Sequence, residues 1–177
     1  MINKLCIIGV GLIGGSLARA LKAADFVGHV TAVGRDEQHL RRAVELGVAD
    51  SYETSIVAAV ADADVVVVAV PVGSMKAVFS AMTGKLKSAA IITDVGSVKG
   101  SIVRDAQSTL TNEFSHFVPG HPIAGTEQSG VEACFAELYR GQRVILTPLE
   151  ETDAVATQTV TQMWHAAGAA SNEEVFL

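Results

Sequence analysis

Six residues near the N-terminus have the composition and spacing of a turn that binds a dinucleotide. They follow an apolar run of strand length at residues 4–8 and read Gly9, Val10, Gly11, Leu12, Ile13, Gly14. In this pattern the first glycine permits a tight turn, the second lets a pyrophosphate approach the backbone, and the third lets helix and strand pack closely. A helix that begins here offers free N–H groups and a partial positive charge to phosphates. The strand–turn–helix context favours nucleotide binding over a bare glycine turn.

The residues after the next expected strand, at positions 30–33, indicate which nucleotide is bound. Domains of this type that bind NAD place an acidic residue there, which holds the ribose 2′-hydroxyl. Here Gly34 takes that position and Arg35 follows it. A glycine leaves room for a 2′-phosphate, and a guanidinium can bind it through two hydrogen bonds. We expect NADP to be preferred, with NAD as the alternative if Asp36 holds the ribose instead.

A further cofactor contact is expected at Val70, Pro71 and Val72. They lie at the end of an apolar run, residues 65–70, whose valines suit a strand buried on both faces. Ligands of open α/β sheets bind beyond the carboxyl ends of the strands, and in related dehydrogenases this segment lies beside the nicotinamide ribose. Simple termination of the strand by Pro71 explains the proline equally well.

Two motifs in the second half carry side chains that could act on a substrate. One runs from Asp94 through Ser97 to Lys99, and the other contains His121 and spans residues 120–130. An imidazole with a pKa of about 6.5 can accept a proton near pH 7. Taken alone, a histidine before a proline more often satisfies backbone groups in a turn. A lone serine at position 97 is more often the N-cap of a helix that begins near Val98.

Together with the glycine pattern, these motifs resemble the prephenate/arogenate dehydrogenase family of tyrosine biosynthesis. The resemblance covers residues 1–168, and the segments 139–141 (Tyr-Arg-Gly) and 145–148 (Ile-Leu-Thr-Pro) fit it as well. Members of that family oxidise the ring C4 hydroxyl of prephenate or arogenate by hydride transfer to a nicotinamide, with loss of the ring carboxylate. The resemblance implies that His121 is the catalytic histidine, which accepts the hydroxyl proton. It also implies that Ser97 hydrogen-bonds both the histidine and the reacting hydroxyl.

The same resemblance implies roles for several neighbouring residues. Thr126 and Glu127 are expected on the substrate side, where Glu127 matches an acidic residue near the substrate entrance of some members. A plain surface carboxylate is an equally good interpretation of Glu127. Asp94 and Lys99 are expected to orient the loop that holds Ser97, and His116 is expected to be exposed.

Positioning these residues requires a sheet with crossover helices. Apolar runs of strand length alternate with segments of helical period, which is typical of an α/β protein. We expect a Rossmann-type, doubly wound, mostly parallel sheet that forms a single nucleotide-binding domain over residues 1–168. Strands are expected at 4–8, 30–33, 50–52, 65–70, 90–93, 116–118 and 144–147. Helices are expected at 12–24, 37–46, 55–60, 75–82, 99–108 and 153–167.

The composition argues against several other classes of protein. Hydrophobic residues make up 49% of the chain, so a sizeable core can be buried, and the net charge of −6 argues against nucleic acid or an anionic membrane as partner. No apolar run approaches the length of a membrane span. The five histidines show no metal-ligand spacing, so we expect no metal. Cys6 and Cys134 form no disulfide framework, which fits the reducing cytoplasm.

Members of the family continue into a helical domain that forms the dimer, closes the substrate cleft and supplies an arginine for the substrate carboxylate. The resemblance implies that this domain is absent here and that residues 169–177 are a tail where it would begin. The apolar surface around His121 and the last helix is then expected to be bare and to favour self-association.

Two functions stay open at this point. The first is a dehydrogenase that acts on a small molecule, prephenate or arogenate, with NADP or NAD. The second is a catalytically incompetent nucleotide-binding fragment. A β-hydroxyacid dehydrogenase is disfavoured, because such enzymes place a catalytic lysine on a later helical domain.

Overall fold

A sheet of six parallel strands forms the centre of the structure, a computed structural model that describes residues 1–174. The strands are β1 (Ile2–Ile8), β2 (Val27–Val33), β3 (Ser51–Glu53), β4 (Val65–Val68), β5 (Ile91–Asp94) and β6 (Phe117–Val118). Their order is β3-β2-β1-β4-β5-β6, and each neighbouring pair is parallel. Successive connections run outward in opposite directions from β1 and β4, which is the doubly wound arrangement. The predicted fold class is confirmed.

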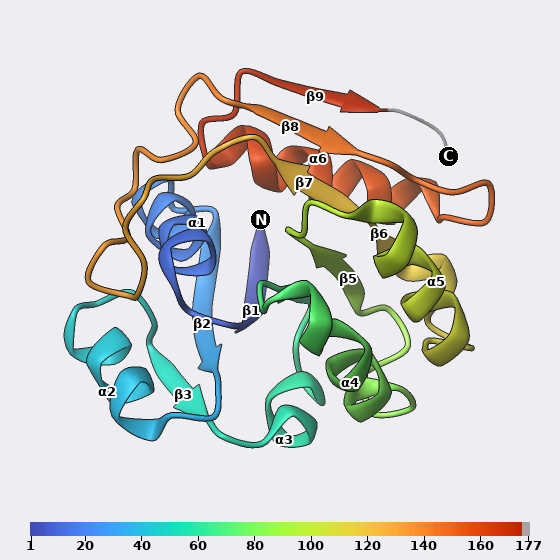
Figure 1. The fold of residues 1–177 in the computed structure, drawn as a ribbon, viewed down its shortest axis with the longest axis horizontal. Helices are drawn as coiled ribbons and strands as arrows, with labels where there is room; N and C mark the ends of the chain where they lie inside the picture. The colour runs from blue at the N-terminus through green and yellow to red at the C-terminus, as the bar shows by residue number, and fades with distance from the viewer. Residues whose placement is uncertain (175–177) are drawn as a thin grey trace.

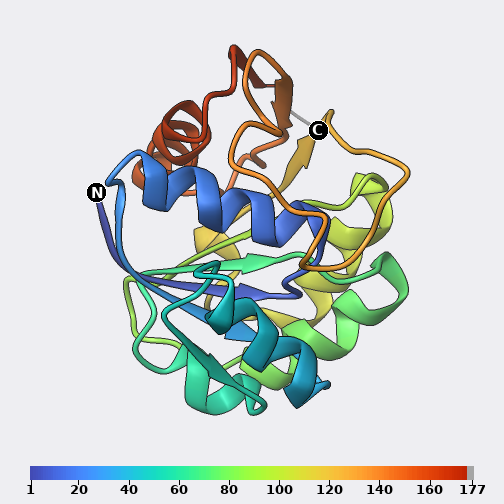
Figure 2. The same cartoon turned by 90° about the vertical axis from the view of Figure 1, so that its left-hand side faces the viewer.

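Helices cover both faces of this sheet (Figure 2). They are α1 (Leu12–Ala23), α2 (Glu37–Glu45), α3 (Ile56–Val60), α4 (Val72–Met82), α5 (Lys99–Thr109) and α6 (Ala154–Ala166). One buried core contains Leu17 of α1 and Trp164 of α6, and the other contains Phe79 of α4 and Ile102 of α5. The helical periodicity in the sequence therefore predicted these elements, with shifts of a few residues at their ends.

Strand β4 is shorter than the sequence predicts. All four of its valines are buried, as expected for a strand covered on both faces. It ends at Val68 because its partners end there as well, with Ile8 of β1 on one side and Asp94 of β5 on the other. Val70 therefore lies in the connection after the strand, and Pro71 occupies the N-cap position of α4 rather than the end of β4.

A second, smaller sheet lies beside α6 (Figure 1). It consists of β7 (Gly120–Pro122), β8 (Arg143–Leu146) and β9 (Ser171–Glu174), with β7 antiparallel and β9 parallel to β8. The sequence predicted β8 but neither of its partners, since β7 is a Gly-His-Pro triplet and β9 is polar. The backbone of β9 extends the fold beyond the predicted boundary at residue 168. Residues 175–177 of the expected tail lie outside the described residues.

The approach to β6 also differs from the prediction. A short 3₁₀ helix, η1 (Phe114–His116), precedes the strand, so β6 begins at Phe117. His116 lies half-buried in this turn, and its predicted exposure is wrong. Across residues 1–174, no helix has the length and apolar character that crossing a membrane requires.

Gly14 lies where α1 packs tightly against the end of β1. A Cβ atom here would overlap the carbonyl oxygen of Gly9 and lie 2.9 Å from Cγ2 of Ile7. At Gly11, three residues earlier, a Cβ would have no heavy atom within 4 Å. The two glycines thus serve different purposes, since Gly14 is required by packing and Gly11 leaves open space.

We predict that Gly14→Ala lowers the free energy of unfolding by roughly 1–3 kcal/mol or more, because the added methyl overpacks the helix–strand contact. Gly11→Ala is the matched control and should cost about 1 kcal/mol or less, the usual range for losing an N-cap glycine. Urea denaturation of both variants measures the difference. Equal losses would contradict the packing role given to Gly14.

Candidate functional site

The predicted cofactor residues meet in one pocket of about 610 Å³ at the carboxyl edge of the large sheet. Connections after β1, β2 and β4 form its walls, because the ends of neighbouring parallel strands lie side by side. The lining residues are Gly9, Val10, Gly11, Val33, Gly34, Arg35, Asp36, His39, Leu40, Ala69, Val70 and Pro71. Leu12, Ile13 and Gly14 form the first turn of α1 beside this pocket, and Val72 is the first residue of α4.

The glycine-rich turn leaves the N-terminus of α1 uncapped. Gly9 has φ +100°, and a Cβ there would lie 2.5 Å from the carbonyl oxygen of Ala69, so the turn requires glycine. Gly11 is the N-cap residue and forms no side-chain cap. The N-cap side chain therefore leaves the first N–H groups of the helix unbound, an arrangement that fits a bound pyrophosphate.

Strand β2 ends at Val33, as the sequence predicts. Val33 is the last paired residue, opposite Ile8, so Gly34 is the first residue beyond the strand. Asp36 is the N-cap of α2, and its Oδ1 accepts hydrogen bonds from the backbone N–H groups of Gln38 and His39 at 2.9 and 3.2 Å. Arg35 is exposed at the pocket and, within residues 1–174, forms no ion pair. The guanidinium of Arg35 is therefore available to a ligand, whereas one carboxylate oxygen of Asp36 is engaged by the helix cap.

A buried ion pair joins the two motifs of the second half. Asp94, at the end of β5, is fully buried and pairs with the ammonium of Lys99. Oδ2 of Asp94 accepts from the N–H of Gly96 at 2.8 Å, and Oδ1 accepts from the N–H of Gly120 at 3.2 Å. Lys99 in turn donates to the carbonyl oxygen of Gly120 at 2.6 Å. The pair therefore fixes the Ser97 loop and the first residue of β7 to each other, beyond the role predicted for it.

Burial acts against both charges of this pair. The loss of water raises the pKa of Asp94 and lowers the pKa of Lys99, while their mutual attraction opposes both changes. Each partner is thus needed to keep the other ionised in the interior.

His121 lies on β7, next to Gly120, with its side chain half-buried. Burial lowers the pKa of His121, the nearby positive charge of Lys99 lowers it further, and the charge of Asp94 opposes these effects. This direction favours the neutral imidazole near pH 7, the state in which one ring nitrogen can accept a proton.

Ser97 is exposed in the loop between β5 and α5. The N-cap residue of α5 is Val98, which forms no side-chain cap, so the alternative role of Ser97 as an N-cap is wrong. Among the described residues, no hydrogen bond joins Ser97 to His121. The serine hydroxyl is consequently free to bind a ligand.

Thr126 and Glu127 lie in the exposed segment that follows β7. The hydroxyl of Thr126 accepts from the N–H of Gln128 at 3.2 Å, which shapes this turn. Further along, the segment returns to α1. There the N–H of Phe135 donates to Oγ of Ser16 at 3.1 Å, and the hydroxyl of Tyr139 donates to the carbonyl oxygen of Ile13 at 2.6 Å.

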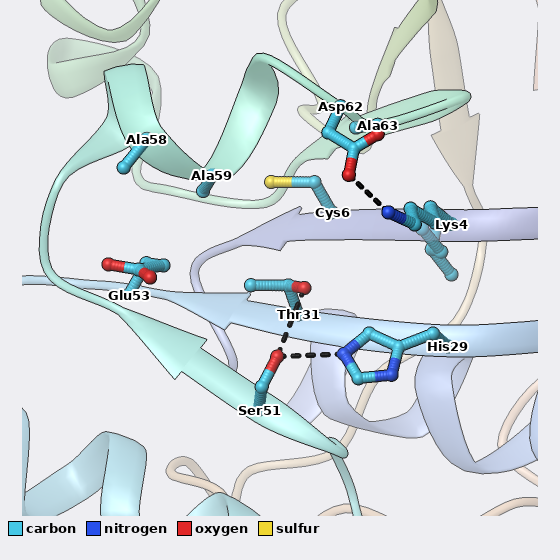
Figure 3. A pocket seen from close by; sticks show the side chains of 11 residues that line it. Lys4, Cys6, His29, Thr31, Ser51, Glu53, Ala58, Ala59, Asp62 and Ala63 are labelled. Carbon is cyan, nitrogen blue, oxygen red and sulfur yellow. Dashed lines mark hydrogen bonds and ion pairs between the residues drawn. The ribbon is translucent and has the colours of Figure 1, made fainter.

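A second cavity, of about 380 Å³, lies over β1, β2, β3 and α3 and contains none of the predicted site residues (Figure 3). Five of its polar side chains are already paired with one another, and Glu53 is the polar lining residue outside these pairs. Lys4 forms an ion pair with Asp62, and Oγ of Ser51 lies 2.8 Å from Nε2 of His29 and 3.2 Å from Oγ1 of Thr31. The edge beyond the carboxyl ends of the strands is therefore the better candidate site. Within the described part of the chain, no cluster of side chains could hold a metal ion.

Sequence reasoning did not find His39 or the link from Lys99 to Gly120. His39 lines the nucleotide pocket from α2, and its Nε2 lies 2.9 Å from the carbonyl oxygen of Val10. A side chain that binds a distant backbone oxygen leaves no pattern along the chain, so no signal in the sequence could have identified either contact.

Comparison with known proteins gives consistent results. Residues 17–173 match the family model described as prephenate dehydrogenase, nucleotide-binding domain. The chain is 42% identical over 170 residues to a cyclohexadienyl dehydrogenase of Zymomonas mobilis and 32% identical over 164 residues to a prephenate dehydrogenase of Bacillus subtilis. The two matches include 96% and 92% of this chain, but the chain spans only 57% and 44% of the length of the two relatives.

Solved structures give the same result. A prephenate dehydrogenase from Aquifex aeolicus, in complex with hydroxyphenyl propionate and NAD⁺, superposes with a TM-score of 0.89 at 34% identity. The superposition includes 100% of this chain and 60% of the Aquifex chain. An arogenate dehydrogenase from Synechocystis superposes with a TM-score of 0.85 at 25% identity. The superposition includes 98% of this chain and 59% of the Synechocystis chain.

We predict that His121 titrates below the ordinary histidine pKa of about 6.5 and that Lys99→Met raises its pKa, since a nearby positive charge is removed. NMR titration of labelled imidazole signals measures both values. Since the pKa of His121 is lower in the folded than in the unfolded chain, the unfolded chain binds a proton at this imidazole more readily. The stability that neutral His121 contributes is therefore full above pH about 6.5 and declines below it. A pKa above 6.5 in the folded protein would contradict this description of the site.

Proposed function

Because the chain belongs to the prephenate dehydrogenase family through its nucleotide-binding domain, we propose that it takes part in the oxidative decarboxylation of prephenate or arogenate. The reaction would be one step of tyrosine biosynthesis, with a nicotinamide dinucleotide as hydride acceptor. The observation that carries the proposal is the placement of His121. The Asp94–Lys99 pair binds the backbone of Gly120, the residue before His121, at the carboxyl edge of the sheet where the glycine-rich turn also lies.

The cofactor, when bound, supplies the acceptor for the hydride that leaves ring carbon C4 of the substrate. This chain's own residues would bind the cofactor, orient the substrate hydroxyl and accept its proton. The uncapped N-terminus of α1 would hold the pyrophosphate, and Val70, Pro71 and Val72 would line the nicotinamide end. Neutral His121 would take the proton of the C4 hydroxyl on a ring nitrogen, while Ser97 donates a hydrogen bond that fixes the hydroxyl. Loss of the ring carboxylate as carbon dioxide then leaves an aromatic ring.

The substrate side is proposed to include Thr126 and Glu127, which are exposed beyond β7. Ile123 and Phe135 of the same segment are exposed apolar side chains, which supports contact with a second chain or with further residues of a longer protein. Cys6 and Cys134 are free and buried, in keeping with a reducing compartment such as the cytoplasm.

NADP is the proposed preferred cofactor. Gly34 puts no carboxylate beside the ribose, Asp36 is engaged as the cap of α2, and Arg35 is exposed at the pocket. A 2′-phosphate at the end of β2 would therefore meet the guanidinium of Arg35, beside an Asp36 carboxylate whose Oδ1 is engaged by the helix cap.

We predict that Arg35→Ala weakens NADP binding by about ten- to a hundredfold, the range expected when a charge-assisted hydrogen bond is lost, and leaves NAD binding nearly unchanged. Arg104→Ala, which removes an exposed arginine from α5, is the control. Fluorescence titration with NADPH and NADH measures the dissociation constants. Equal losses for the two nucleotides would show that Arg35 does not contact the 2′-phosphate.

The proposed reaction is tested by following absorbance at 340 nm with prephenate or arogenate and NADP or NAD. We predict that His121→Asn lowers kcat by about 10²–10⁴-fold, as expected for loss of a general base, while nucleotide affinity is retained. Full activity in that variant would refute the role of His121. A flat trace for the unaltered chain with intact nucleotide binding would instead favour a non-catalytic nucleotide-binding module.

A further inference from the structure

The glycine-rich turn is tied to α2 by the side chain of His39. Nε2 of this half-buried histidine lies 2.9 Å from the carbonyl oxygen of Val10. A carbonyl oxygen can only accept, so Nε2 carries the hydrogen and donates it. The contact joins residues 29 positions apart in the sequence.

The carbonyl of Val10 lies between two backbone groups that are paired within the fold. The N–H of Gly9 bonds to Val33 and the carbonyl of Gly11 accepts from Gly15. Over residues 1–174, no other hydrogen bond to the Val10 oxygen is present. Since the side chain of Val10 is buried, the peptide group cannot easily turn to find water. The imidazole therefore determines where this oxygen points.

The direction of that oxygen matters for an anionic ligand. The N–H groups at the start of α1 attract phosphate, whereas a carbonyl oxygen directed at the same place would repel it. The hydrogen bond to His39 directs the oxygen toward α2. His39 also lines the pocket together with Arg35 and Asp36, so the start of α2 is fixed to the turn.

We propose that His39 is a positioning residue for dinucleotide binding. It holds the Val10 peptide in the orientation that leaves the helix N-terminus open to the pyrophosphate. The inference rests on the proposed nucleotide-binding function but concerns a different part of the ligand from Arg35. Because NAD and NADP share the pyrophosphate, His39 contributes equally to the binding of both.

The test compares His39→Ala and His39→Gln by fluorescence titration with NADH and NADPH, together with thermal unfolding of each variant. Glutamine reaches about as far as histidine and can donate the same hydrogen bond. His165→Ala removes an exposed histidine from the end of α6 and is the matched control. We expect His39→Ala to weaken both nucleotides by about three- to tenfold, and His39→Gln and His165→Ala to bind like the unaltered chain.

Five outcomes overturn the inference. Unchanged affinity in His39→Ala shows that the tether is dispensable, and failure of glutamine to restore binding shows that the hydrogen bond is not the cause. A loss confined to NADPH places His39 at the 2′-phosphate instead. A loss that accompanies unfolding at the assay temperature assigns the residue to stability alone. If the unaltered chain binds neither nucleotide, the proposed function is wrong along with this inference, whereas the other outcomes leave that function standing.

Discussion

The buried pair of Asp94 and Lys99 is the interaction on which the arrangement of the site depends. Removing a carboxylate and an ammonium from water costs several kcal/mol for each ion, and only close pairing with further hydrogen bonds offsets this cost. Here the further bonds go to the backbone of Gly96 and to both backbone groups of Gly120. The requirement to satisfy two buried charges thus fixes the β5–α5 loop and strand β7 in one geometry. Ser97 and His121 are carried by these two segments.

A second set of contacts joins this half of the molecule to the nucleotide pocket. The chain that leaves β7 packs on α1, where the hydroxyl of Tyr139 binds the first turn through Ile13. The ring of Tyr139 meets that of Trp164 edge to face at a centroid distance of 5.0 Å, so α6 supports the same contact. The turn that would hold the cofactor and the strand that holds the imidazole therefore belong to one packed unit, as hydride transfer between fixed partners requires.

Elements with a strong periodic signal could be predicted from the sequence, whereas contacts made by single side chains could not. The four valines of β4 and the glycine turn after β1 predicted the local structure correctly, because burial on two faces and a tight turn each restrict residue type. Strand β7 was missed, since a Gly-His-Pro triplet has no strand pattern and exists through its pairing with β8. The alternative in which Ser97 caps α5 was wrong, because the helix begins one residue later and Val98 is its N-cap. The tether from His39 depends on tertiary packing, which local sequence does not encode.

Amide hydrogen exchange in the native state, compared between the unaltered chain and Lys99→Met, tests the central claim most directly. If the buried pair locks the two motifs together, the N–H groups of Gly96 and Gly120, which donate to Asp94, should exchange at least about tenfold faster in the variant. The N–H of Gly9, which bonds to Val33 in the nucleotide half, should keep its rate. Unchanged exchange at Gly96 and Gly120, or the same acceleration at all three amides, would contradict the account.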